Sequence, residues 1–127
     1  MADRKRILIA DDDPDLLELL KMDLTFQDYE IRTATNGKDA LEIATKEKFD
    51  LVLLDVMMPY IDGYHVASEI SSKLGANAPN IMIMTSRDTQ REHGVAMMSG
   101  AASVMQKPFG MAELHKKIKE VIEKKQQ

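Results

Sequence analysis

The chain has 127 residues, of which 44% are hydrophobic, and 17 Lys and Arg against 21 Asp and Glu give a formal net charge of −4. These values fit one domain over residues 1–127 and argue against a nucleic-acid surface. The chain has no cysteine, which excludes disulfides, thiol nucleophiles and thiolate metal sites. The sequence shows neither a signal peptide nor an apolar stretch of membrane-spanning length, so we expect a cytoplasmic protein.

Short apolar runs alternate with amphipathic segments along the chain, a pattern that predicts strands and helices in turn. In chain order we predict a strand at Arg6–Ala10, a helix at Pro14–Phe26, a strand at Tyr29–Ala34, a helix at Gly37–Glu47, a strand at Asp50–Asp55, a helix at Gly63–Lys73, a strand at Asn80–Thr85, a helix at Thr89–Ser99, a strand at Ala102–Gln106 and a helix at Met111–Lys125. Asp13 is a typical N-cap for the first helix, because Pro14 follows at the first helical position.

Five successive strand–helix units predict an α/β protein with a parallel sheet that is covered by helices on both faces. Right-handed crossovers leave few arrangements, and the flavodoxin-like, doubly wound (βα)5 fold with strand order 2-1-3-4-5 suits a chain of this length. In that order the first and third strands are neighbours, so the residues after Ala10 lie beside Asp55. Ligands of such sheets bind at the carboxyl ends of the strands, where we therefore expect the functional site.

Reactive side chains follow four of the predicted strands at that edge. They are Asp11 and Asp12 after the first strand, Asp55 at the end of the third, Thr85 at the end of the fourth and Lys107 after the fifth. Taken singly, each has an ordinary explanation as a turn, strand-end or solvated residue. Their conjunction favours a site. Three neighbouring carboxylates repel one another unless a cation lies between them, and oxygen-only ligands suit Mg2+.

A carboxylate can attack phosphorus and form an aspartyl phosphate, which is the reaction expected at this edge. Asp55 is the best nucleophile because it ends the central strand, and Asp11 and Asp12 then serve the metal ion. Lys107 would neutralise the incoming phosphoryl group, and the Thr85 hydroxyl would donate a hydrogen bond to it.

With these residues in place, the sequence resembles the receiver domains of bacterial two-component response regulators, which have the CheY-like fold. The resemblance covers essentially the whole chain. It rests on four motifs, which are Ile7-Leu8-Ile9-Ala10-Asp11-Asp12-Asp13, Leu53-Leu54-Asp55-Val56-Met57-Met58-Pro59 with Asp62-Gly63, Met84-Thr85-Ser86, and Lys107-Pro108-Phe109.

The resemblance implies a role for each residue of the predicted site. It implies that Asp55 is the phospho-acceptor, that Thr85 is the switch hydroxyl and that Lys107 pairs with the phosphoryl group. The implied ligands of Mg2+ are Asp11, Asp12, Asp55 and the main-chain carbonyl of Met57.

The resemblance also implies a partner, a sensor histidine kinase or a histidine phosphotransfer protein that donates a phosphoryl group from histidine. The protein then catalyses only its own phosphorylation and slow dephosphorylation. It signals by a conformational change on the face of the fourth helix, fifth strand and fifth helix, toward a downstream protein that the sequence does not identify. We expect a monomer or a phosphorylation-dependent dimer, no nucleic-acid or membrane partner, and no output domain in this chain.

Some positions depart from the pattern of the family. Val104 stands where an aromatic side chain is common, so an aromatic rotamer switch is excluded and signalling would rely on the fourth helix and the loop before it. Ala102 and Ser103 replace a common acidic pair, which puts the charged dimer contact of one DNA-binding subgroup in doubt.

The fourth helix is a candidate moving part, because Gly94 in its interior costs roughly 1 kcal/mol relative to Ala. Met97, Met98 and Met105 near Val104 predict a soft apolar face. This face either changes shape for a partner upon phosphorylation or simply packs the helix on the sheet.

Two further expectations concern the histidines and the side chains beside the site. His65, His93 and His115 lie on helices among polar residues and are expected to be solvated. Met57 and Arg87 lie where they could shield or steer attacking water.

Three other functions remain open. A hydrolytic phosphatase with an aspartyl intermediate would often carry a second Asp two residues after the nucleophile, where this chain has Met57. A flavin or nucleotide binder would need Ser, Thr or Gly amides after the first strand, where this chain has Asp11–Asp13. A receiver-like protein that acts only by binding partners would use the same fold without the chemistry.

Overall fold

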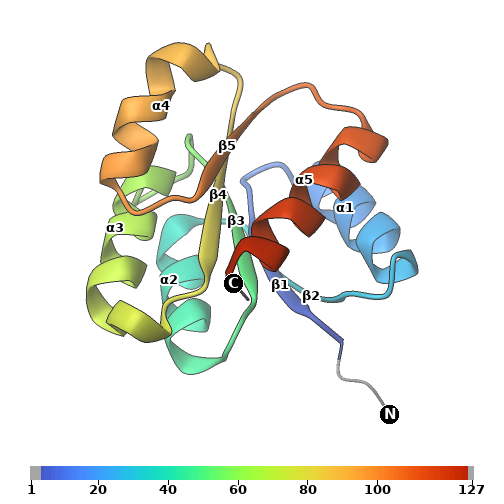
Figure 1. Ribbon diagram of the computed structural model, residues 1–127, viewed down its shortest axis with the longest axis horizontal. Coiled ribbons are helices and arrows are strands. Elements are labelled where there is room, and N and C mark those ends of the chain that lie inside the picture. Colours follow the sequence, from blue (N-terminus) through green and yellow to red (C-terminus); the bar gives the residue numbers. More distant parts are fainter. Residues whose placement is uncertain (1–3, 126–127) are drawn as a thin grey trace.

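The computed structural model describes residues 4–125 and confirms the alternation of strands and helices (Figure 1). The elements are β1 Arg6–Ala10, α1 Pro14–Phe26, β2 Glu30–Ala34, α2 Gly37–Lys46, β3 Leu51–Asp55, α3 Gly63–Leu74, the short 3-10 helix η1 Gly75–Asn77, β4 Asn80–Thr85, α4 Thr89–Met98, β5 Ser103–Gln106 and α5 Met111–Lys125. The strands are parallel and lie in the order β2-β1-β3-β4-β5, as predicted.

Several predicted bounds are wrong by one residue, and local hydrogen bonds explain why. The Tyr29 N–H donates to the Leu24 carbonyl at 3.1 Å, which closes the loop after α1 and makes β2 begin one residue later. The Ser99 N–H donates back to the carbonyls of Val95 and Ala96, so Ser99 caps α4 instead of extending it.

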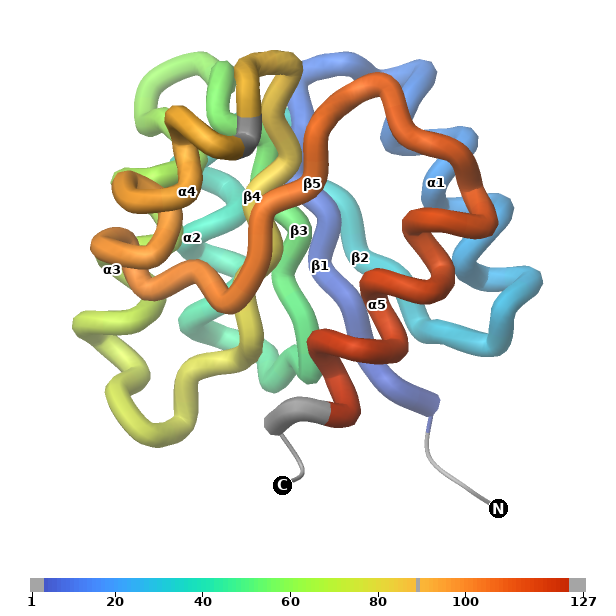
Figure 2. The backbone as a smooth tube through the Cα atoms, turned by 45° about the horizontal axis from the view of Figure 1, so that its top comes forward, coloured from blue at the N-terminus to red at the C-terminus, as the bar shows by residue number. Residues whose placement is uncertain are grey.

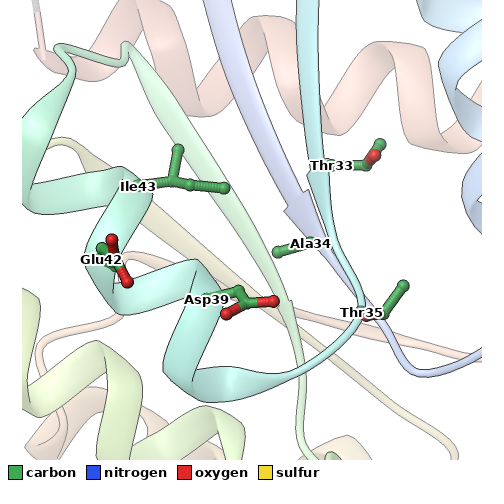
Figure 3. A pocket seen from close by; sticks show the side chains of 6 residues that line it. All are labelled: Thr33, Ala34, Thr35, Asp39, Glu42 and Ile43. Atoms are coloured by element: carbon green, nitrogen blue, oxygen red, sulfur yellow. The ribbon is translucent and has the colours of Figure 1, made fainter.

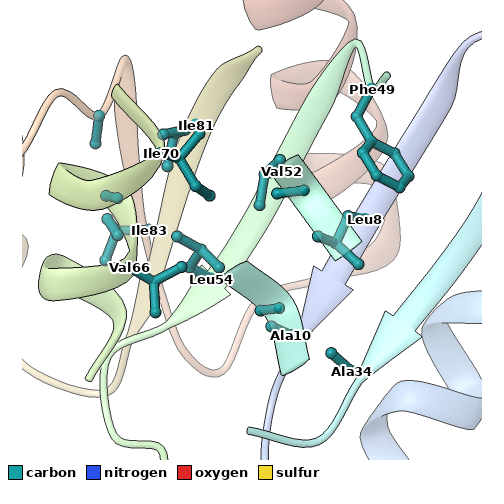
Figure 4. Close-up of a cluster of buried hydrophobic side chains, with 14 of the residues drawn as sticks. Leu8, Ala10, Ala34, Phe49, Val52, Leu54, Val66, Ile70, Ile81 and Ile83 are labelled. Atoms are coloured by element: carbon teal, nitrogen blue, oxygen red, sulfur yellow. The ribbon is translucent and has the colours of Figure 1, made fainter. Parts of the chain in front are cut away.

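The helices cover both faces of the sheet and bury two apolar cores. Helices α2, α3 and α4 lie on one face, and α1 and α5 lie on the other (Figures 1 and 2). On β3, Val52 and Leu54 belong to the core under α2–α4 (Figure 4), whereas Leu51 and Leu53 belong to the core under α1 and α5. All residues of β3 are buried, as a central parallel strand requires, and Asp55 is the residue at which this strand ends.

Polar caps fix where the first four long helices begin. The Oδ1 of Asp13 accepts from the N–H groups of Asp15 and Leu16 at 3.0 and 3.3 Å, which confirms Asp13 as an N-cap. Each such cap stabilises a helix by about 1 kcal/mol. The four capping residues are Asp13, Asn36, Asp62 and Asp88.

Gly63 allows α3 to pack directly on the end of β3. A Cβ atom at this position would lie 2.3 Å from the carbonyl oxygen of Asp55, so only glycine fits. The Gly63 N–H also donates to the Val56 carbonyl at 2.9 Å. These contacts hold the backbone at Asp55 against the first turn of α3.

The predicted methionine face is wrong in part, because its residues lie on opposite sides of the sheet. Met97 and Met98 are exposed on α4, whereas Met105 is buried in the core under α1 and α5. Val104 is partly buried against the core under α2–α4. The exposed apolar surface of α4 therefore consists of Val95, Met97 and Met98.

The solvation expected for the histidines holds for His65 and His93, which are exposed, but is wrong for His115. The Nε2 of His115 lies 2.5 Å from Asp23 Oδ2 and joins α5 to α1. Within residues 4–125, no helix has the length and apolar character that crossing a membrane requires.

Candidate functional site

The parallel register gathers the predicted site residues at one edge of the sheet. Asp11 directly follows β1, Asp55 ends β3, Thr85 ends β4 and Lys107 directly follows β5. Because all strands run in the same direction, the connections after β1, β3, β4 and β5 meet at this edge, which lies at the top of Figure 2.

Three carboxylates and one ammonium group form the centre of the site. Asp11, Asp12 and Asp55 each offer an oxygen, and these atoms lie within 4.8 Å of one another. Asp11 and Asp55 are buried, whereas Asp12 is exposed. The Nζ of Lys107 lies 2.6 Å from Asp11 Oδ2 and 3.0 Å from Asp55 Oδ1.

The three carboxylates of this centre carry more negative charge than the single ammonium group of Lys107 can neutralise. Burial raises the pKa of Asp55, Asp11 and Asp12 raise it further by repulsion, and the hydrogen bond from Lys107 only partly opposes them. Burial by itself would lower the pKa of Lys107, but its bonds to Asp11 and Asp55 outweigh this effect and raise it. Lys107 therefore remains a cation, and one more positive charge would stabilise the ionised cluster.

The donor set fits a hard divalent cation. The ligand atoms that come together are carboxylate oxygens, without a nitrogen or sulfur ligand in the cluster. Oxygen-only sites of this kind suit Mg2+ better than zinc or copper. A cation here would also relieve the repulsion that raises the pKa of Asp55.

Backbone hydrogen bonds hold the surrounding loops in place. The Asp13 N–H donates to Asp11 Oδ1 at 3.0 Å, and the Lys107 N–H donates to the Thr85 carbonyl at 2.7 Å. Thr85 is buried, and its Oγ1 accepts from the Arg87 N–H at 3.0 Å. The loop after β4 is thus tied to Thr85 and, through Lys107, to the loop after β5.

Met57 and Arg87 contact each other at the rim of this site. Arg87 Nη2 lies 3.8 Å from Met57 Sδ. The sequence did not reveal that Arg87 also faces Glu92, which in turn accepts a hydrogen bond from the Tyr64 hydroxyl. Tyr64 and Glu92 are 28 residues apart, so only the packing of α3 beside α4 brings them together.

Two hollows elsewhere contain none of these residues. One, of about 290 Å³, lies between β2 and α2 and is lined by Thr33, Ala34, Thr35, Asp39, Glu42 and Ile43 (Figure 3). The other, of about 890 Å³, lies at the opposite edge of the sheet around Arg6, where Glu30 and Glu47 already neutralise the guanidinium. Neither hollow offers a competing site for the expected chemistry.

Comparison with known proteins gives the family. The model of the response regulator receiver domain matches residues 7–119. The response regulator MprA of Mycolicibacterium vanbaalenii is 38% identical over 109 residues, which are 86% of this chain and 46% of that protein. MprA of Mycobacterium leprae is 36% identical over 117 residues, which are 92% of this chain and 50% of that protein. The chain spans about half the length of these curated relatives.

Solved structures agree with this match. The CheY-like receiver domain protein of Methanospirillum hungatei has a TM-score of 0.90 and 27% identity, covering 98% of each chain. The response regulator TrrA of Thermotoga maritima, solved in complex with Mg(2+)-BeF, has a TM-score of 0.82 and 38% identity, covering 92% of this chain and 98% of that one. The chain therefore belongs to the response regulator receiver domain family, and its CheY-like, flavodoxin-like fold is confirmed.

Proposed function

We propose that Asp55 accepts a phosphoryl group from a histidine of a sensor histidine kinase or a histidine phosphotransfer protein. The observation that carries the proposal is the position of Lys107, whose ammonium lies between the buried carboxylates of Asp11 and Asp55. A cation fixed beside a strand-end carboxylate can neutralise a phosphoryl group as it arrives. Family membership supports the same assignment.

In the proposed reaction, a carboxylate oxygen of Asp55 forms a bond to phosphorus as the bond from phosphorus to the donor's histidine nitrogen breaks. The electron pair of the broken bond stays on that nitrogen. Lys107 stabilises the negative charge on the phosphoryl oxygens and holds Asp55 in place before the reaction. The Thr85 hydroxyl donates a hydrogen bond to the bound phosphoryl group, which draws the loop after β4 toward the site.

We propose that Asp11, Asp12, Asp55 and the main-chain carbonyl of Met57 hold Mg2+. The repulsion among the three carboxylates and their oxygen-only chemistry support this ligand set. When bound, Mg2+ would supply further positive charge at these carboxylates and reduce the repulsion between Asp55 and the phosphoryl oxygens.

We infer that the protein acts as a switch rather than as an enzyme with a separate substrate. We take residues 1–127 as one receiver domain in the cytoplasm, which catalyses only its own phosphorylation and slow dephosphorylation. Its signal would pass to a downstream protein as a conformational change on the face of α4, β5 and α5, in a monomer or a phosphorylation-dependent dimer. Val95, Met97 and Met98 supply exposed apolar area on α4.

Intact mass spectrometry tests the proposal. The wild-type protein, incubated with acetyl phosphate and Mg2+, should gain the mass of one phosphoryl group. The gain should disappear in Asp55→Asn and when EDTA removes the metal. A wild-type protein that gains no mass and binds no beryllofluoride would contradict the proposal, because both probes address the same site.

A further inference from the structure

A chain of polar contacts connects α3 and α4 to the rim of the site. The Tyr64 hydroxyl, on α3, donates to Glu92 Oε1, on α4, at 2.6 Å. The same oxygen lies 3.8 Å from Nη1 of Arg87, in the loop after β4. Nη2 of Arg87 in turn lies 3.8 Å from Sδ of Met57, two residues after Asp55.

The Glu92 carboxylate is largely buried and therefore needs polar or charged partners. Its side chain is only 13% exposed, although it lies on a helix whose other residues are mostly exposed. A carboxylate removed from water in this way is stable only beside donors or a positive charge. Burial and the bond to Glu92 raise the pKa of Tyr64, so its hydroxyl keeps its proton and remains a donor.

Arg87 is held much more weakly than Glu92. Its side chain is 58% exposed, and both contacts that we find for the guanidinium within residues 4–125 are long. Thioether sulfur is a weak acceptor, whereas a guanidinium binds phosphoryl oxygens strongly and in a bidentate manner. A phosphoryl group on Asp55 would therefore compete with Glu92 for Arg87.

We propose that Arg87 exchanges partners between Glu92 and the phosphoryl group on Asp55, and that Glu92 is the positioning residue that sets this balance. The inference rests on the proposed phosphorylation of Asp55 and adds a device for reading it. In the free protein, Glu92 holds Arg87 at the rim. When Arg87 turns to the phosphoryl group, Glu92 loses its cation and keeps the hydrogen bond from Tyr64.

The exchange predicts opposite effects on phosphoryl-mimic binding for substitutions at Glu92 and at Tyr64. Glu92→Gln removes the charge that competes for Arg87, so beryllofluoride, as a phosphoryl mimic, should bind more tightly. Tyr64→Phe removes the other donor to Glu92 Oε1, which strengthens the hold of Glu92 on Arg87 and should weaken binding. Each change should be roughly two- to fivefold in Kd, the scale of a partly exposed ion pair.

Isothermal titration calorimetry with beryllofluoride in excess Mg2+ would measure these affinities at low salt. The decisive readout is the dependence on Arg87, which a merely structural role would not produce. In an Arg87→Ala background, both substitutions should lose their effect on Kd. Glu30→Gln is a matched control, because Glu30 also pairs with an arginine, Arg6, but at the amino-terminal ends of the strands, away from the site.

The outcomes separate the inference from the function on which it rests. Wild-type protein that binds no beryllofluoride would overturn both. Wild-type binding with an unchanged Kd in Glu92→Gln and Tyr64→Phe, or with changes that persist in Arg87→Ala, would overturn only the exchange of partners. Tighter binding in Glu92→Gln, weaker binding in Tyr64→Phe and loss of both effects without Arg87 would establish it.

Discussion

The ammonium of Lys107 lies 3.0 Å from Asp55 Oδ1, although the two residues are 52 positions apart in the chain and belong to separate strand ends. The pair spans β4, which lies between β3 and β5, so Lys107 must reach across one strand to contact Asp55. The Lys107 N–H helps by donating to the Thr85 carbonyl at the end of β4. The position of Lys107 therefore depends on the correct arrangement of the strand ends at this edge of the sheet.

Lys107→Ala should lower the rate of phosphorylation of Asp55 by acetyl phosphate by roughly 10²-fold, because a fixed positive charge is lost where negative charge develops. The rate in Lys107→Arg should lie between those of the wild type and Lys107→Ala, since the planar guanidinium keeps the charge but cannot occupy the position of a compact ammonium. The time course of intact mass measures both rates. Lys46→Ala is the matched control: Lys46 also binds a carboxylate, that of Glu42 at 2.9 Å, on the exposed side of α2. Equal rates in wild type and Lys107→Ala would contradict the role given to Lys107.

Asp55→Asn should stabilise the protein when Mg2+ is absent. The pKa of Asp55 is raised in the folded state, so its contribution to stability is present below its ordinary pKa and is lost as pH rises through the raised value. At neutral pH the ionised, buried carboxylate is therefore destabilising, and removing its charge should add about 1 kcal/mol, or roughly 3–6 °C in Tm.

Added Mg2+ should reverse this difference, because an ion that binds the folded state stabilises it by an amount that grows with the logarithm of the free ion concentration divided by Kd. Thermal unfolding of both proteins with EDTA and with Mg2+, at neutral pH, provides the measurement. Asp28→Asn is the control, since Asp28 is exposed and pairs only with Arg4 among the described residues. A wild-type Tm that does not respond to Mg2+ would count against the metal site.

Gly63→Ala should destabilise the protein by about 1–3 kcal/mol, because its methyl group would overlap the Asp55 carbonyl. The same displacement should slow phosphorylation of Asp55. Gly94→Ala, in the interior of α4, meets nothing within 4 Å and should stabilise by about 0.5–1 kcal/mol. Midpoints of urea unfolding compare the two, and a neutral Gly63→Ala would show that the start of α3 can move away from β3.

The sequence was sufficient for the fold and for the residues that meet at the site, because both follow from where strands end. Runs such as Leu51–Leu54 identify buried strands, and a parallel sheet places their last residues at one edge. Contacts between helices were not predictable in this way. The bond from Tyr64 to Glu92 and that between His115 and Asp23 depend on the rotation of one helix against another, which no short motif encodes. The prediction for Met105 was wrong because successive side chains of a strand point to opposite faces of the sheet. Val104 packs against the core under α2–α4, so Met105, the next residue, enters the core under α1 and α5.

The Tyr64 hydroxyl should ionise above the ordinary pH range of a tyrosine, because its pKa is raised in the folded protein. Its pKa is raised by burial and by the neighbouring Glu92 carboxylate, which repels the phenolate. Because the folded-state pKa lies above the unfolded one, Tyr64 stabilises the fold below its ordinary pKa and this contribution disappears as pH rises through the folded value. Spectrophotometric titration of phenolate absorbance should show a late step that is absent in Tyr64→Phe. Glu92→Gln should move that step to lower pH because the repelling charge is gone, whereas a step that stays in place would mean that the hydroxyl does not donate to Glu92 in solution.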